Sequence, residues 1–447
     1  MNGYDVVVIG GGCAGLSAGV RLARGGARVL VLEGKARLGG RATSFDDRDS
    51  GEVVDNGQHV LLGCYTETLE FLHDIGAAGD VRVQPQLAVT MIDRLGRRSR
   101  LTCPALPSPL HLLAGVLEWD ALKWRDRLAV LGMATPIRLA RKTLRPGSTL
   151  QAASSGETVE NWLIRNGQTQ PIREMLWNPL ALAALNQPPE QAAAPAFARV
   201  LAEMFGTDPK AAAVVLAGKP LEALYGEPAK RFIQARGGEV RTGAAARVRV
   251  EGDAVVAVDA AGTTWPAALV VSAVPWFALA ELFESIPPAL APTVDRAGHM
   301  AASPIVTVNL WFGARVLDEP FVGLPGRTMQ WVFDKSLIFG EPTSHLSTVS
   351  SGAASIVGQS NDALIALALD ELSAALPRVR SARLVRATVV REPRATFSLA
   401  PGQPQRPPSE TPIRGFFLAG DWIDTGLPAT IESAVRSGHR AAALCAE

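Results

Sequence analysis

The first fifty residues contain a glycine pattern that few folds accommodate. Residues 5–9 are apolar after the first position, as expected for a buried parallel strand. Gly10, Gly12 and Gly15 follow in G-x-G-x-x-G spacing. The first glycine permits a tight turn, the second lets the backbone approach a diphosphate, and the third lets the next helix pack on the strand. The N-terminus of that helix offers free N–H groups to phosphates. This stretch predicts a strand–turn–helix–strand unit that binds a nucleotide cofactor.

Three further segments extend the predicted cofactor site. Glu33 ends the second strand, about twenty residues further along, where a carboxylate can hold ribose hydroxyls. The segment 37–41, RLGGR, combines two glycines with arginines that can pair bidentately with a diphosphate. Near the other end, an apolar strand leads into Asp421, and Thr430 is a candidate N-cap for a helix. Residues 246–276 predict a β-meander followed by a buried strand.

The pattern R-x-G-G-R-x-x-S at 37–44 resembles the GG-motif flavoproteins, which include amine oxidases, carotenoid desaturases and protoporphyrinogen oxidases. The resemblance implies FAD as cofactor and an α/β fold: a Rossmann-like FAD-binding domain with an inserted α+β substrate domain. It also implies that Asp421 holds the ribityl chain, that the last helix points at the flavin ring and that Val248 touches the adenine. A nicotinamide cofactor is the alternative, but it leaves the GG segment without a role. The predicted cofactor-binding residues are Gly10, Gly12, Ala14, Gly15, Glu33, Arg37, Gly40, Arg41, Gly57, Gln58, His59, Val248, Asp421, Ala429, Thr430 and Ile431.

The positions of these motifs predict a discontinuous cofactor domain. The predicted FAD-binding domain comprises residues 1–60, 225–278 and 412–447, and the predicted substrate domain comprises residues 61–224 and 279–411. The proline-rich stretch 401–412 is a natural crossover between the two. Alanine-rich tracts at 181–198 and 211–217 are predicted to be packed helices.

Composition excludes several classes of partner and site. The 447 residues carry a formal net charge of +1, so we expect no nucleic-acid partner. The four cysteines show no CxxC spacing and no nearby histidine pattern, so we expect neither a disulfide frame nor a metal site. The chain starts without a charged-then-apolar leader, and it has no uninterrupted apolar run of about 18 residues. We therefore expect no secretory signal and no membrane-spanning helix.

The segment 93–145 differs from the rest of the chain because it combines arginine clusters with tryptophans and short apolar stretches. These features predict a protrusion that lies in a membrane interface, with Trp119 and Trp124 at the depth of the lipid headgroups. The alternative is a helical cap over the substrate cavity, with its basic residues in solvent. The basic residues expected near anionic lipid are Arg94, Arg97, Arg98 and Arg100.

Four stretches make the resemblance more specific. They are DNGQHVLLGCYTETLEFL (55–72), LWNPLALAALNQPPEQA (176–192), REPRATFSLAPGQPQRP (391–407) and LAGDWIDTGLPATIESAVRSG (418–438). Together they resemble the hydroxysqualene dehydroxylases over nearly the whole chain. The resemblance implies a bacterial enzyme that reduces hydroxysqualene to squalene for hopanoid synthesis. The electron donor and the oligomeric state are left open by the sequence.

The size of the implied substrate carries a further expectation. Moving a C30 isoprenoid from a membrane into water costs roughly 0.8 kcal/mol of free energy per CH2, or on the order of 20 kcal/mol in total. We therefore expect a dry apolar tunnel that opens at a membrane. The expected location is cytoplasmic, peripheral on the inner face of the cytoplasmic membrane.

The stretch 55–65 contains the predicted catalytic residues. In GG flavoproteins the strand after the arginine motif returns to the flavin. Gly57 and Gln58 are therefore expected along the isoalloxazine and His59 beside its reactive face. Loss of an allylic hydroxyl needs a proton, and an ordinary histidine pKa near 6.5 suits its delivery by His59 or by a water it holds. Alternatively, His59 only hydrogen-bonds flavin or backbone. Tyr65 is a second candidate proton donor, with a role in the core as its alternative.

Two other protein classes are compatible with parts of the pattern. A flavin-dependent desaturase or oxidase of another polyisoprenoid, or of an amine, shares the cofactor motifs. With three tyrosines, the chain offers little for the aromatic pair that frames an amine. Rab escort and GDP-dissociation-inhibitor proteins resemble this fold and carry prenylated partners. The flavin motifs, intact from Gly10 to Asp421, disfavour that class.

Overall fold

The computed structural model describes residues 3–47, 51–107, 110–143, 156–206, 208–341 and 344–447. One of its sheets is fully parallel, in the order β10-β2-β1-β14-β20. Its strands are β1 (Val6–Ile9), β2 (Val29–Leu32), β10 (Glu239–Arg241), β14 (Val270–Ser272) and β20 (Phe416–Leu418). β1, β2 and β14 are buried along their whole length, as expected for strands covered on both faces. Because these strands come from distant parts of the sequence, the sheet is assembled discontinuously. The predicted Rossmann-like α/β class is confirmed.

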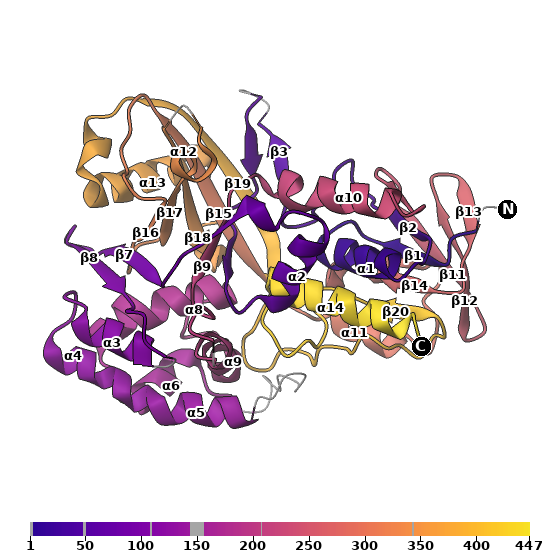
Figure 1. Ribbon diagram of the computed structural model, residues 1–447, viewed down its shortest axis with the longest axis horizontal. Helices are drawn as coiled ribbons and strands as arrows, with labels where there is room; N and C mark the ends of the chain where they lie inside the picture. Colours follow the sequence, from indigo (N-terminus) through magenta and orange to yellow (C-terminus); the bar gives the residue numbers. More distant parts are fainter. Residues whose placement is uncertain (1–2, 48–50, 108–109, 144–155, 207, 342–343) are drawn as a thin grey trace.

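Two helices begin at the carboxyl edge of this sheet, where open α/β sheets bind ligands. α1 (Cys13–Arg24) follows β1 across the glycine turn, and α14 (Ile431–Leu444) follows β20. α1 lies between α14 and α10 (Glu227–Gln234) (Figure 1). Gly438 allows α14 to approach α1 closely, since a Cβ at this position would overlap Ala14 O and Ser17 Oγ.

The predicted meander is present beside this sheet. It consists of β11 (Ala246–Glu251), β12 (Ala254–Ala260) and β13 (Thr263–Pro266), paired antiparallel in that order. A short antiparallel pair, β3 (Ser44–Asp46) and β4 (Val53–Asp55), continues from the GG segment. It leads the chain back to the edge of the parallel sheet through residues 55–59.

The second large sheet has seven strands in the order β19-β15-β18-β17-β16-β7-β8. They are β7 (Ala88–Ile92), β8 (Arg98–Thr102), β15 (Ala302–Phe312), β16 (Phe321–Gly323), β17 (Trp331–Asp334), β18 (Ser344–Ser351) and β19 (Leu384–Phe397). Alternate residues of β15, including Val306 and Val308, pack with α13 (Asn361–Ala375) in one apolar cluster. The residues between them, such as Thr307, point to the opposite face.

A group of helices lies below this sheet in Figure 1. They are α3 (Leu110–Glu118), α4 (Trp124–Ala129), α5 (Ala134–Thr143), α6 (Val159–Arg165), α7 (Gln170–Ile172), α8 (Asn178–Leu185) and α9 (Ala194–Met204). Phe197 of α9 meets Trp162 and Trp177 edge-to-face, with ring centroids 6.4 Å apart in both pairs. α2 (Thr66–Asp74) packs on α14. α11 (Ala291–Gly298) directly precedes β15, and α12 (Lys335–Phe339) connects β17 to β18 and contacts both strands.

The prediction of helix for 211–217 is wrong. Val214–Ala217 is strand β9, which pairs with β5 (Val60–Leu62) and β6 (Val81–Val83). Valines favour a pleated surface, and two partner strands satisfy the backbone on both edges. The tract 181–198 is helical in two pieces, which separate at Asn186, a left-handed residue with φ 50°.

The segment 93–145 divides into the β7–β8 hairpin and helices α3–α5; its residues 108–109 and 144–145 lie outside the described parts of the chain. Trp119 is 1% exposed and packs in the core, so its predicted position among lipid headgroups is wrong, whereas Trp124 is 62% exposed. Three of the predicted lipid-facing arginines form ion pairs at or near the hairpin: Arg94 with Glu174, Arg97 with Asp93 and Arg98 with Glu319. Among the described residues, no helix is both long and apolar enough to cross a membrane.

The contact between α1 and α14 gives a direct stability test. We expect Gly438→Ala to destabilise the protein by about 1–3 kcal/mol, because the methyl group must displace a backbone carbonyl in a packed interface. Gly298→Ala, at an exposed end of α11 with open space around it, should leave stability nearly unchanged. Urea unfolding of both variants measures the difference; equal midpoints would contradict this packing.

Candidate active site

The glycines of the turn between β1 and α1 have two different roles: some are required by packing, and one leaves space for a ligand. Gly10 has φ +113°, and a Cβ on it would lie 2.7 Å from Ala273 O. A Cβ on Gly15 would overlap Gly10 O. Around Gly12, by contrast, a Cβ would meet nothing closer than 3.8 Å. Gly12 is the N-cap of α1, and no side chain forms a capping hydrogen bond at the N-terminus of this helix. The protein therefore leaves both space and uncapped N–H groups at the position predicted to face a diphosphate.

The GG segment lies beside this turn. Gly39 forms an isolated parallel bridge with Gly12, and Gly39 N donates to Gly11 O at 2.8 Å. Gly39 and Gly40 have φ +103° and +65°, which disfavour any residue with a Cβ. A Cβ on Gly40 would lie 3.2 Å from Gly12 Cα. The two glycine loops thus form a single strip of backbone that carries no side chains.

Glu33 and Val248 are buried where the sequence predicted adenosine contacts. Glu33 follows β2; its Oε2 accepts from Gly11 N at 2.6 Å and its Oε1 from Lys35 N at 2.8 Å. A carboxylate has about four acceptor positions, so two are left for ribose hydroxyls. Val248 lies on β11, paired with Val258.

Arg41 and Asp421 meet across the site. Arg41 Nη1–H donates to Asp421 Oδ2 at 3.1 Å and to Ala395 O at 3.0 Å, and Nη2–H donates to Asp421 Oδ1. The GG segment and the Gly-Asp segment are therefore joined directly. Arg37 is outside this group: it is exposed and lies 5.1 Å from the ring centroid of Phe45.

The N-terminus of α14 converges on the same place. Thr430 is its N-cap, as predicted, and its Oγ1 accepts from Ser433 N at 3.1 Å. Ile431, next to it, lines a narrow apolar cavity of about 10 Å³ together with His59 and Cys13, the first residue of α1. The two helix N-termini and His59 thus lie around one small space. Ala429 precedes the cap and is partly buried.

A buried ion pair fixes the segment that leads to His59. Lys335 Nζ donates to Asp55 Oδ2 at 2.8 Å and to Gln58 Oε1 at 2.6 Å. Both charged side chains are 2% exposed. Ser44 Oγ and Leu221 N donate to Asp55 Oδ1, and together with Lys335 they hold the pKa of Asp55 below its usual value despite its burial. The sequence analysis missed Lys335; its only signal was a lysine directly after a short apolar strand.

Gly57 faces the seven-stranded sheet. A Cβ on Gly57 would lie 3.4 Å from Thr307 Oγ1 of β15. That hydroxyl oxygen is buried and has no hydrogen-bond partner.

His59 is held in one tautomer. Its Nδ1 lies 2.8 Å from Gly57 O, a group that only accepts, so Nδ1 carries the proton and Nε2 is an acceptor. Burial lowers the pKa of His59 below 6.5; Asp55 and the bond to Gly57 oppose this effect, and Lys335 adds to it. The expectation of an ordinary histidine pKa is therefore wrong, and His59 is neutral at pH 7.

Tyr65 is the residue before α2 and its hydroxyl interacts with Thr430. Burial, with smaller contributions from Cys64 and Glu432, raises the pKa of Tyr65 above its usual value. Tyr65 therefore keeps its proton at neutral pH and can donate a hydrogen bond beside the N-terminus of α14.

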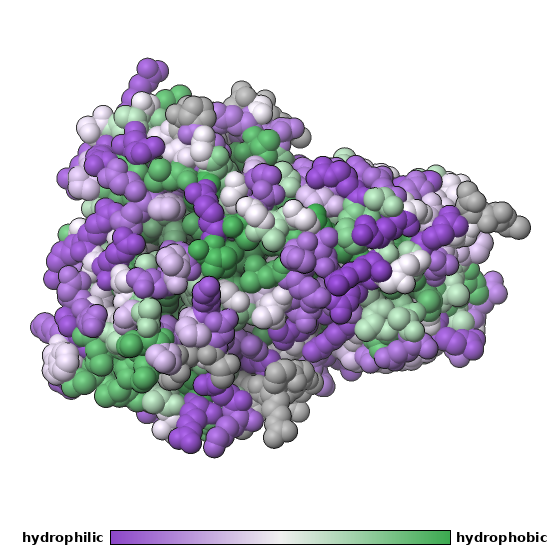
Figure 2. Space-filling view, viewed as in Figure 1, coloured by the Kyte–Doolittle hydropathy of each residue, from purple (hydrophilic) through white to green (hydrophobic). Residues whose placement is uncertain are grey.

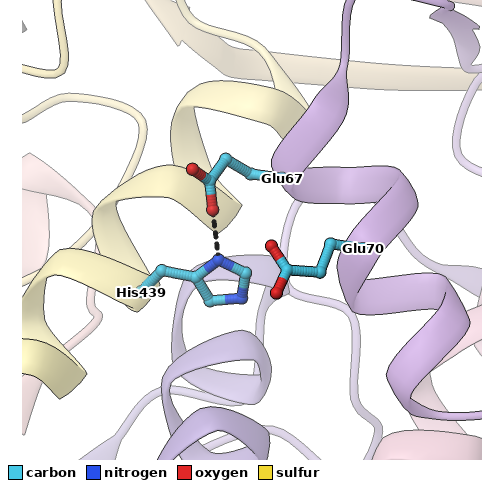
Figure 3. A group of neighbouring side chains, drawn as sticks. All are labelled: Glu67, Glu70 and His439. Atoms are coloured by element: carbon cyan, nitrogen blue, oxygen red, sulfur yellow. Dashed lines mark hydrogen bonds and ion pairs between the residues drawn. The ribbon is translucent and has the colours of Figure 1, made fainter.

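One group among the described residues has metal-ligand spacing: Glu67, Glu70 and His439, whose ligand atoms all lie within 4.8 Å (Figure 3). His439 Nδ1 is 2.5 Å from Glu67 Oε2, and Arg21 Nη1 is 2.9 Å from Glu70 Oε1. Since a guanidinium already compensates one carboxylate and the histidine bonds to the other, the group is best described as a link between α2 and α14.

Comparisons with known proteins agree with this fold. The model of the family "Flavin containing amine oxidoreductase" matches residues 13–446. A hydroxysqualene dehydroxylase from Rhodopseudomonas palustris is 32% identical over 98% of this chain and 97% of its own. A 15-cis-phytoene desaturase from Glycine max is 26% identical over 99% of this chain and 79% of its own. The solved cyclohexylamine oxidase of Brevibacterium oxydans has the same fold, with a TM-score of 0.73, 17% identity and 99% coverage of both chains.

The pair of Lys335 and Asp55 predicts an unequal effect of two lysine substitutions. Lys335→Met should cost about 3–5 kcal/mol of unfolding free energy, because it leaves the Asp55 carboxylate buried and uncompensated. Lys219→Met removes an exposed partner of Asp80 and should cost less than about 1 kcal/mol. Denaturant unfolding compares the two. If both variants lose less than about 1 kcal/mol of unfolding free energy, the buried Asp55 carboxylate does not need Lys335 for its stabilisation.

Proposed function

The chain belongs to the family of flavin-containing amine oxidoreductases and is an FAD-dependent oxidoreductase, and we propose that it reduces hydroxysqualene to squalene. The observation that carries the proposal is the likeness to the Rhodopseudomonas palustris hydroxysqualene dehydroxylase, which extends along 98% of this chain. Two of the four stretches quoted from the sequence contain Asp55 and Asp421, which form the Lys335 and Arg41 contacts of the candidate site. The proposed location is the inner face of the cytoplasmic membrane.

The proposed reaction exchanges an allylic hydroxyl for hydrogen. The C–O bond breaks, the oxygen leaves as water after taking a proton, and the carbon receives a hydride. Bound reduced FAD supplies that hydride. The protein has to bind the cofactor and the hydrocarbon, exclude water and deliver one proton to the leaving oxygen.

The groups proposed to hold the cofactor are the two glycine loops, Glu33, the pair of Arg41 and Asp421, and the N-terminus of α14. For the hydrocarbon we propose the region between the seven-stranded sheet and the helices, where the buried side chains form one packed apolar cluster. Phe321, Phe333 and Val349 contribute to it from the sheet, and Leu112 and Val116 from α3. Such walls suit a polyisoprenoid and contain few groups that could react with an allylic cation.

His59 is the proposed proton carrier. Neutral His59 presents Nε2 as an acceptor, so it can take up a proton there or hold a water that delivers one. Burial disfavours the protonated ring most, Asp55 favours it and Lys335 opposes it, so the ion pair only modifies how strongly His59 retains the proton. A depressed pKa makes the protonated ring a stronger acid, which favours transfer to a poor leaving group. Tyr65 keeps its proton and acts in this proposal as a hydrogen-bond donor next to Thr430.

A membrane-facing surface on helices α3–α5 completes the proposal. Figure 2 shows a hydrophobic patch over this part of the molecule. The large apolar side chains that are exposed between residues 110 and 143 are Leu110, Trp124, Leu128, Leu131 and Leu139. Basic side chains that suit anionic lipid lie on the same helices or directly before them, and are Lys123, Arg125, Arg138, Arg141 and Lys142. The large cost of moving a C30 hydrocarbon through water supports uptake at such a surface.

A desaturase is the second candidate, because a 15-cis-phytoene desaturase is 26% identical over 99% of this chain. It would use the flavin in the opposite direction, with oxidised FAD removing hydrogen from a polyisoprenoid. The two candidates differ in the oxidation state of the flavin that reacts with substrate.

The deciding experiment mixes enzyme and substrate without oxygen. Enzyme carrying reduced FAD is mixed with hydroxysqualene in detergent, and enzyme carrying oxidised FAD is mixed with phytoene. The proposal requires squalene in the first mixture, formed as the flavin reoxidises, and no reaction in the second. If only the mixture of oxidised enzyme and phytoene reacted, the protein would be a desaturase and the proposal would be wrong.

The role of His59 predicts a specific pH profile. The pKa of His59 in the folded protein lies below 6.5. Its protonated form is therefore populated only as the pH falls through this lowered pKa. The rate of flavin reoxidation by substrate should therefore rise towards acid pH. His59→Gln should be about 100-fold slower at pH 6 and should lose this pH dependence while retaining FAD.

His73→Gln, on an exposed part of α2, is the matched control and should behave as the native enzyme. Stopped-flow absorbance of the flavin measures all three proteins. An unchanged profile in His59→Gln would remove His59 from the proton pathway.

The membrane surface predicts a loss of vesicle binding. Trp124→Glu combined with Leu131→Glu should reduce co-flotation with phosphatidylglycerol vesicles at least about tenfold, because both exposed apolar side chains become charged. Val385→Glu, an equally exposed change on β19 outside the patch, should float like the native protein. Equal flotation of all three proteins would exclude α3–α5 as the binding surface.

A further inference from the structure

Arg406 is a buried cation that the protein compensates only in part. It lies in the proline-rich crossover 401–412, with 8% of its side chain exposed. Its Nη1–H donates to Leu427 O at 2.7 Å. Its Nη2 is buried without a hydrogen-bond partner, and Asp424 Oδ1 is 3.7 Å away, beyond hydrogen-bond distance. Burying a donor of a charged group without a hydrogen bond is costly even when a carboxylate is nearby, so the Nη2 position calls for an acceptor.

Arg406 keeps its charge at neutral pH. Burial lowers its pKa to about 10, while Asp424 and Asp421 act in the opposite direction. The guanidinium is therefore cationic under all conditions in which a flavoenzyme of this kind would work. Its unpaired donor is a permanent feature of the folded chain.

The surroundings of Arg406 are those of the cofactor site. The crossover runs along the segment that leads from β20 to α14: Leu418 N donates to Ser409 O and Asp424 N donates to Pro407 O, each at 2.8 Å. Leu427, the partner of Arg406, stands two residues before Ala429, a predicted flavin contact. Arg406 therefore supports the loop that presents the N-terminus of α14.

Arg406 and Arg41 flank the same aromatic pair. Arg406 lies 5.3 Å from the ring centroid of Phe397, and Arg41 lies 5.2 Å from that of Trp276. The two rings meet edge-to-face with centroids 6.3 Å apart. The charge of Arg41 is balanced by a bidentate contact with Asp421, whereas Arg406 has no comparable partner.

We propose that Arg406 is a second cofactor-anchoring arginine, whose free Nη2–H donates to the negative charge of bound FAD. FAD carries such charge in two places: the diphosphate in every state, and the isoalloxazine once it is reduced. Charge-assisted hydrogen bonds of guanidinium groups suit both. The proposal depends on FAD binding and is independent of the identity of the substrate.

The test compares Arg406→Gln with Arg414→Gln. Arg414 is an exposed arginine at the end of the same segment, and its contact with Asp253 is 3.5 Å. For each protein we would measure thermal unfolding of the apoprotein, the affinities for oxidised FAD and for ADP, and the midpoint potential of the bound flavin. Arg414→Gln should match the native protein in all of them.

If Arg406 binds the diphosphate, Arg406→Gln should weaken both FAD and ADP at least about tenfold, with an unchanged potential. If it binds the reduced ring, the affinity for oxidised FAD should stay within about twofold. Reduced FAD should then bind about tenfold more weakly, which lowers the potential by about 30 mV for a two-electron couple. Either result supports the proposal, and unchanged affinities together with an unchanged potential overturn it.

If Arg406 had a purely structural role, Arg406→Gln would lower the unfolding temperature of the apoprotein. The flavin potential and the affinities for FAD and ADP would then equal those of Arg414→Gln. Should Arg406→Gln fail to fold, Arg406→Lys keeps the charge but loses the planar fork. That variant should bind FAD or ADP more weakly than the native protein, or shift the potential. Native values for Arg406→Lys would then overturn the proposal.

Discussion

One carboxylate, Asp55, joins three parts of the chain that surround the active site. Ser44, from the end of the GG segment, and the backbone of Leu221 donate to one of its oxygens, and Lys335, from the seven-stranded sheet region, donates to the other. A buried charge is costly unless it is paired and hydrogen-bonded, so each of these contacts helps to compensate the Asp55 carboxylate. Residues 57–59 follow directly, and their position relative to the sheet depends on this arrangement. The proposed chemistry at His59 therefore rests on an ion pair whose members stand 280 positions apart.

The cofactor surface follows from the parallel sheet in a similar way. Because β1 and β20 run in the same direction, α1 and α14 both begin at the carboxyl edge, and their N-termini face one region. The glycines at 12, 39 and 40 keep that region free of side chains. Arginine and aspartate side chains border it. The positive helix ends and the arginines provide a favourable field for a dinucleotide and for a reduced flavin.

Local motifs made much of this predictable from the sequence. The turn at Gly10–Gly15, the GG segment, the meander and the cap at Thr430 each depend on residues within a few positions of one another. What could not be predicted depends on distant packing. Lys335 and Arg406 are ordinary basic residues in the sequence, and only the fold buries them beside Asp55 and Leu427. The pKa of His59 was misjudged for the same reason, since burial is a property of the fold.

Short apolar stretches were also ambiguous. Trp119 and Trp124 stand five positions apart with similar neighbours, yet one packs in the core and the other is exposed. Their difference is set by the turn between α3 and α4, which periodicity alone does not fix. Likewise, residues 214–217 form a strand because two partner strands lie on either side. Of the two tryptophans predicted at the lipid headgroups, Trp124 is therefore exposed, as membrane contact requires, and Trp119 is not.

Transfer of hydride from reduced flavin to the carbon that loses the hydroxyl can be followed by isotope labelling. Reduced enzyme would undergo a single anaerobic turnover with hydroxysqualene in deuterated water, and the product would be analysed by mass spectrometry. The N5 hydrogen of reduced flavin exchanges with solvent, so we expect squalene that carries one deuterium at the former hydroxyl carbon. Squalene without deuterium, or no squalene while the flavin stays reduced, would rule out this hydride transfer.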